Sequence, residues 1–118
     1  MLRKSKTFSK GVLYHLKWKA DLKEFIAGKI NVNVAEISSE DCKFGKWLRS
    51  AEMTKYASTL EIRQINSLHT ELHEIAKRVC ELKMSGQNVA SRREFKKMQT
   101  ISMKLNSLLL ALMIVNKN

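Results

Sequence analysis

Apolar residues recur at helical spacing along the first quarter of the chain. From about Ser5 to Gly28 they form one row, and His15 falls in the same row. Such a row marks the buried face of a helix, so we expect His15 to face inward. Gly28 suits a helix end because glycine adopts the left-handed conformation readily. The apolar members of the row are Phe8, Val12, Trp18, Leu22 and Phe25.

Two more long helices are predicted in the second half of the chain. One runs from about Thr59 to Ser85, with Gly86 ending it. The other opens at Ser91, where the order Ser-Arg-Arg-Glu fits a capping box, and continues to about Val115. Their inward rows are Ile62, Ile65, Leu68, Leu72, Ala76 and Val79 in the former, and Phe95, Met98, Leu105, Leu109 and Leu112 in the latter.

A short helix is predicted between these long ones. The serine pair ending at Ser39 offers N-caps for a helix over about residues 40–49, with acidic residues in its first turn. Cys42 then sits near a helix N-terminus, where a thiolate is favoured. Residues 30–34 alternate like a strand, but nothing else in the chain could pair with them. We therefore expect a connecting loop there.

Composition agrees with an all-α fold. The 118 residues include no proline and four glycines, and the length suits one domain over residues 1–118. We predict an antiparallel four-helix bundle with one short helix that carries Cys42. The last helix is apolar nearly all round at Leu108, Leu110, Met113 and Ile114. That face is either a small exposed patch or a self-association surface, and we favour self-association because contiguous apolar patches seldom face water.

The net charge of +11 raises the question of nucleic-acid binding. The excess of cations is confined to residues 1–30 and 91–118. In an up-down bundle the basic starts of the first and last helices would lie at opposite ends, which disfavours one continuous phosphate-binding surface. We therefore favour a solvated basic surface over a nucleic-acid patch.

Cysteine usage and hydropathy point to a reducing cytoplasm. Cys42 and Cys80 are too few for a disulfide framework, and no signal-type apolar segment follows the basic start. The longest apolar run, residues 108–115, is well short of the ~20 residues that span a bilayer. The initial methionine favours a separate protein over one domain of a longer receptor.

His69 and His73 lie four residues apart in a predicted helix, so both can aim at one point. The pair resembles half of the H-E-x-x-H motif of zinc hydrolases, but Glu71 stands one place too late. At about 100° per residue it points away from the pair and cannot act as a general base there. The peptidase interpretation therefore fails, and metal binding or an ordinary polar pair remains.

The remaining inward histidine and one cysteine complete a donor set. A lone inward histidine is usually a satisfied core residue, whereas one thiolate with three imidazoles satisfies a tetrahedral zinc ion. Cys80 lies seven residues beyond His73, roughly 10 Å along one helix, which is too far to share an ion. It is expected to be a small core residue.

These residues together resemble the chemoreceptor zinc-binding (CZB) domain family. His15-Leu16-Lys17-Trp18 matches H-x-x-W, residues 42–47 match C-x-apolar-G-x-W, and residues 69–73 match H-x-x-x-H. The elements match in order and spacing, and the resemblance covers nearly the whole chain. By this resemblance the zinc ligands are His15, Cys42, His69 and His73, supported by Trp18, Phe44, Gly45 and Trp47.

The resemblance also implies a helical bundle, often dimeric, that serves bacterial chemoreceptors or diguanylate cyclases or occurs alone. Gly45 would allow a close backbone approach, and the aromatic residues would keep water from the metal, although plain core packing would explain them equally well. Oxidation of Cys42 would remove the only anionic ligand, and the resulting loss of zinc could release the short helix. Falling zinc could release it without oxidation. We therefore expect a zinc-responsive or oxidant-responsive regulatory module.

Two other classes of function have less support from the sequence. An enzyme is not expected, because four protein ligands close the coordination sphere and no other catalytic constellation stands out. The alternative is a basic helical nucleic-acid-binding protein with a purely structural zinc, whose affinity would depend strongly on salt and not on zinc.

Overall fold

The computed structural model describes residues 2–28 and 42–115, with side chains from Phe8 to Ile114. All regular structure in these residues is helical, which confirms the all-α prediction. No helix in these ranges is long and apolar enough to cross a membrane. The elements are α1 (Leu2–Ile26), α3 (Lys43–Leu48), the 3₁₀ helix η1 (Ala51–Tyr56), α4 (Leu60–Met84) and α5 (Asn88–Val115).

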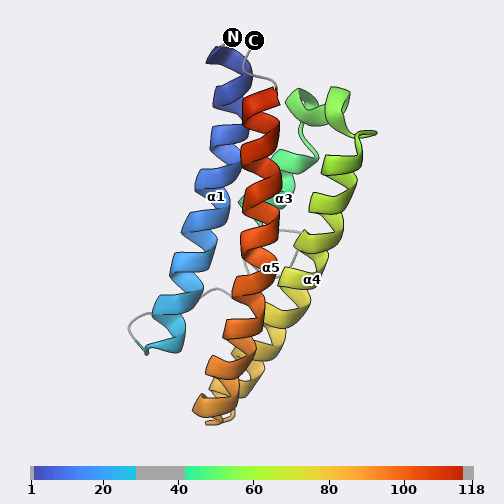
Figure 1. Ribbon diagram of the computed structural model, residues 1–118. Helices are drawn as coiled ribbons and strands as arrows, with labels where there is room; N and C mark the ends of the chain where they lie inside the picture. The colour runs from blue at the N-terminus through green and yellow to red at the C-terminus, as the bar shows by residue number, and fades with distance from the viewer. Residues whose placement is uncertain (1, 29–41, 116–118) are drawn as a thin grey trace.

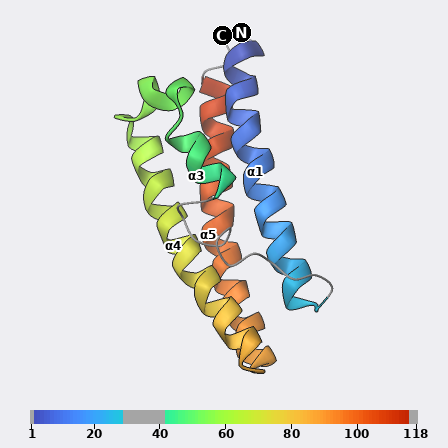
Figure 2. The same ribbon diagram turned by 180° about the vertical axis from the view of Figure 1, so that it is seen from behind.

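The three long helices lie side by side, and α5 packs against both α4 and α1 (Figure 1). Helix α5 runs antiparallel to α4 and α1, so the start of α1 and the end of α5 lie at the same end of the molecule. The short α3 lies on the side opposite α5, between α1 and α4 (Figure 2). It therefore covers the face that the three long helices leave open there.

The predicted inward rows form the core. Every predicted apolar position of α5 is buried, as are five of the six in α4, Leu68 being half-buried. In α1, Phe8 and Leu22 are buried, and the other predicted positions are partly buried. The buried members from α4 and α5 are Ile62, Ile65, Leu72, Ala76, Val79, Phe95, Met98, Leu105, Leu109 and Leu112.

Helix ends follow the expected backbone chemistry in three places. Gly28 and Gly86, which follow α1 and α4, both have left-handed φ angles of 79° and 82°. Thr59 is the N-cap of α4, and its hydroxyl accepts a hydrogen bond of 3.3 Å from the amide of Ile62. These caps confirm the predicted bounds of α4.

The predicted start of the last helix is wrong. Helix α5 begins at Asn88, so Ser91 lies inside its first turn and its amide donates to the carbonyl of Gln87. The Ser91 hydroxyl is fully buried and donates to the carbonyl oxygen of Val79 at 3.0 Å, across the interface with α4. A contact between two helices therefore uses the hydroxyl that sequence analysis assigned to a local cap.

The predicted short helix is present as α3. Its described part begins at Lys43, with Cys42 as the N-cap; the predicted loop at residues 30–34 and the cap at Ser39 lie outside the described residues. Sequence analysis missed η1, because six residues show no helical period. Its Met53 is buried and adds to the core.

Helix α3 reaches α1 through the indole of Trp47. A Cβ atom at Gly11 would lie 2.5 Å from Cη2 and Cζ3 of that ring, so only glycine leaves room for it. Phe8 meets the same ring edge-on, with ring centroids 6.2 Å apart, and Trp47 is 4% exposed. The position of α3 therefore depends on a glycine in α1, which has no side chain to displace the indole.

We expect Gly11→Ala to lower the free energy of unfolding by about 1–2 kcal/mol. Overpacking costs about 1–3 kcal/mol, and the better helix propensity of alanine offsets up to about 1 kcal/mol. Chemical denaturation would measure the change, with Leu16→Ala as control because Leu16 is 46% exposed on the same helix. Unchanged stability in Gly11→Ala would mean that the indole moves away without loss.

Candidate metal centre

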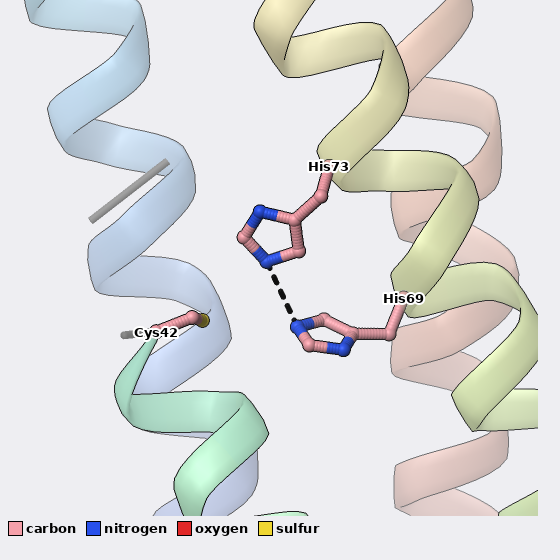
Figure 3. A group of neighbouring side chains, drawn as sticks. All are labelled: Cys42, His69 and His73. Atoms are coloured by element: carbon pink, nitrogen blue, oxygen red, sulfur yellow. Dashed lines mark hydrogen bonds between the residues drawn. The ribbon is translucent and has the colours of Figure 1, made fainter. Parts of the chain in front are cut away.

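Three predicted ligands come together between α3 and α4. Cys42 caps the start of α3, and His69 and His73 lie one turn apart on α4, all pointing into the same space (Figure 3). One donor atom from each lies within 4.8 Å of the others, and the three residues are buried. Burial and convergence are what a closed metal site requires.

The two histidines already point at each other. Their Nε2 atoms are 2.9 Å apart, so one ring donates an N–H and the other accepts it. Two nitrogens bound to one tetrahedral zinc ion at 2.0–2.1 Å lie roughly 3.4 Å apart. Only a small separation of the rings would therefore turn this hydrogen-bonded pair into a pair of ligands.

Burial keeps two of the imidazoles in the form that binds metal. Burial is the larger cause, and together with positive charge on His73, His15 and Arg49 it lowers the pKa of His69 to about 3. Burial also lowers the pKa of His15 to about 4, with smaller effects from Lys19 and His73. Both rings are therefore neutral at neutral pH, and no proton has to leave them before a metal binds.

His15 is close to this group but outside it. It is buried in α1, and its Nε2 forms a hydrogen bond of 2.6 Å with Oγ of Ser102 in α5. The mutual effects of His15 with His69 and His73 on pKa values place it in the same electrostatic environment. The structure thus brings three of the four predicted ligands together, and ligation by His15 stays a prediction.

Aromatic rings surround the histidines. Phe44 packs against His69 with ring centroids 5.1 Å apart, and Trp18 packs against His73 at 5.1 Å. Trp47 lies one ring further out, 5.6 Å from Phe44. Phe44 is 1% exposed. These rings separate the polar donors from solvent, which strengthens the binding of an ion there.

Gly45 and Cys80 are both buried and lie outside the three-residue group. Gly45 is buried within α3, and its carbonyl accepts a hydrogen bond from the amide of Arg49 at 3.2 Å. Cys80 is buried, is not a member of the three-residue group, and burial together with Glu81 raises its pKa to about 11. A thiol with so high a pKa is a poor ligand and a poor nucleophile.

Sequence analysis missed Ser102 and Gly11. A signal for Ser102 was present, because it continues the inward row of α5 between Met98 and Leu105 and is the polar member of that row. Nothing in the local sequence distinguishes Gly11, since its role depends on a tryptophan 36 residues away.

The donor set suits zinc. One sulfur and two imidazoles are typical zinc ligands, and their burial favours a structural or regulatory ion over an exposed acidic site. When bound, zinc would supply one positive centre shared by ligands from separate helices. Fold and donor set together define a helical metal-binding domain.

A comparison with known families identifies this domain. The model of the chemoreceptor zinc-binding domain matches residues 15–80, which is more than half of the chain. The chain belongs to that zinc-binding family, as the resemblance in its motifs predicted. No curated protein and no solved structure matches it.

We expect protein purified without added metal to carry about one zinc ion per chain. Cys42→Ala removes the anionic donor and should lose most of the zinc, whereas Cys80→Ala should keep it because that residue is outside the group. Mass-spectrometric metal analysis of the three proteins measures this directly. Full zinc content in Cys42→Ala would rule out the cysteine as a ligand.

Proposed function

We propose that this protein is a sensory and regulatory zinc-binding module of bacterial chemotaxis or cyclic-di-GMP-type signalling. The position of Cys42 is the main support. It is the sulfur of the metal-binding group and also the N-cap of α3, a helix of six residues. A change at this one sulfur therefore acts directly on the short element that covers the open face of the long helices (Figure 2).

The complete ligand set in this proposal is His15, Cys42, His69 and His73. His15 is buried and neutral at neutral pH, and it interacts electrostatically with both histidines of α4. Four ligands from α1, α3 and α4 would join these helices at one point, so much of the zinc affinity would appear as folding stability. The full bundle then has the short helix as its fourth member.

Two signals could release α3. Falling zinc leaves the ligands without an ion. Alternatively, the Cys42 thiolate attacks an oxygen of hydrogen peroxide, so that an S–O bond forms, the O–O bond breaks, and the leaving hydroxide takes up a proton to become water. The resulting sulfenic acid is a weaker donor than the thiolate. In either case Cys42 no longer holds the start of α3.

Several broader features belong to the same proposal. Residues 1–118 act as one cytoplasmic domain without catalytic activity, and the partner is a chemoreceptor, a cyclase or another signalling protein. The alternative of a basic nucleic-acid binder is less well supported, because α1 and α5 begin at opposite ends of the molecule (Figure 1). One continuous phosphate-binding surface would need their basic starts side by side.

We also propose that the protein forms a homodimer through α5. Met103, Leu110 and Ile114 are 67%, 43% and 74% exposed, and their spacing places them within about 20° of one line along the helix. Met103 also borders an open groove of about 980 Å³ between α4 and α5. Burying this apolar stripe against a second copy would remove it from water.

We expect hydrogen exchange of residues 42–50 to become faster when zinc is chelated or when Cys42 is oxidised by peroxide. The start of α3 would then have lost its attachment to α4. Mass spectrometry on the Cys80→Ser variant would confine the oxidation to Cys42. Equal protection with and without zinc would leave a purely structural site and end the proposal of a switch.

We expect the double substitution Leu110→Glu and Ile114→Glu to convert the dimer to a monomer, because it places two charges on each apolar stripe. Sedimentation equilibrium should give twice the 13.6 kDa chain mass for the unmodified protein and one chain mass for the variant. The matched control is Met84→Glu with Val89→Glu, which are similarly exposed at the far end of the α4–α5 pair. A single chain mass for the unmodified protein would refute the dimer.

A further inference from the structure

We propose that Ser102 is a positioning residue of the zinc site, which holds His15 through its Nε2 atom and leaves Nδ1 to bind the ion. This inference rests on the proposed role of His15 as the fourth ligand. It assigns a function to α5, which contributes no donor to the group formed by Cys42, His69 and His73.

The contact between these two residues is short and enclosed. Oγ of Ser102 lies 2.6 Å from Nε2 of His15, and both residues are 2% exposed. Water therefore has little access to either group, and each provides a hydrogen bond that the other needs in the core. A buried hydroxyl–imidazole pair of this kind orients the ring.

A serine at position 102 is unusual among its neighbours in α5. Its neighbours in the inward row, Met98 and Leu105, are fully buried apolar residues. A hydroxyl at such a position is unfavourable unless it is paired, and the hydrogen bond to His15 supplies the partner. The polar residue therefore stands opposite a predicted ligand within an otherwise apolar row.

The chemistry of imidazole relates this contact to the nitrogen that would bind the metal. A neutral ring has one N–H and one bare nitrogen, and a ligand histidine usually donates its N–H to a nearby oxygen while the bare nitrogen binds the metal. In the proposed arrangement Nε2–H of His15 donates to Oγ of Ser102, and Nδ1 is then the bare nitrogen. The hydroxyl of Ser102 can rotate to accept this N–H, and the bond then fixes the orientation of the His15 ring.

The test measures zinc affinity by competition with a chelator of known affinity. Ser102→Ala should weaken zinc binding about 10-fold or more, the usual effect of removing a group that orients a ligand. Ser102→Thr, which keeps the hydroxyl, should restore most of the affinity. Ser91→Ala is the matched control, because it removes another buried hydroxyl of α5, one that bonds to the Val79 carbonyl.

A second readout separates orientation from general stability. Ring chemical shifts of zinc-loaded protein should place the metal on Nδ1 of His15, a result that a purely structural role of Ser102 would not require. Metal on Nε2, or a Ser102→Ala affinity equal to that of Ser91→Ala, would overturn the inference.

The variant His15→Gln separates an error in the proposed ligand set from an error in the role of Ser102. If it leaves zinc affinity unchanged, the proposed ligand set is wrong, and the role of Ser102 fails with it. If it weakens zinc binding while Ser102→Ala does not, the ligand set stands and only the positioning role is refuted.

Discussion

Imidazole nitrogens buried in an apolar core need hydrogen-bond partners, and this constraint organises the molecule around its three histidines. A buried imidazole without a hydrogen bond is destabilising, and a charged one more so. His69 and His73 bond to each other, and His15 bonds to Ser102. The low pKa values of His15 and His69 follow from the same burial. Buried rings held by hydrogen bonds are well prepared to bind zinc.

The aromatic residues connect this polar centre with the rest of the fold. Phe44 packs against both His69 and Trp47, and Trp47 in turn packs against α1 at Gly11. A six-residue helix has little stability of its own, so α3 depends on these contacts and on Cys42 at its start. The shortest α-helix of the described residues thus begins at the sulfur donor, which is why we assign the regulatory change to it.

The sequence predicted those features of the fold that depend on a helical period or on a local motif. The burial of the α4 and α5 rows follows from periodicity, and the glycine ends of α1 and α4 follow from backbone chemistry. The capping box at Ser91 was wrong because local capping and contact with α4 make use of the same hydroxyl, and the packed helix decides between them. The 3₁₀ helix η1 was missed because it is too short to show a period.

The sequence by itself determined the helical class, the inward faces, and a donor set whose order and spacing identify the family. These properties depend on neighbours three or four residues apart or on types of residue that metal chemistry demands. Only the tertiary structure decided how closely Cys42 approaches His69 and His73, that Gly11 receives the indole of Trp47, and that His15 bonds to Ser102. Each of these contacts links different helices, and their geometry depends on how the helices pack, which no local pattern encodes.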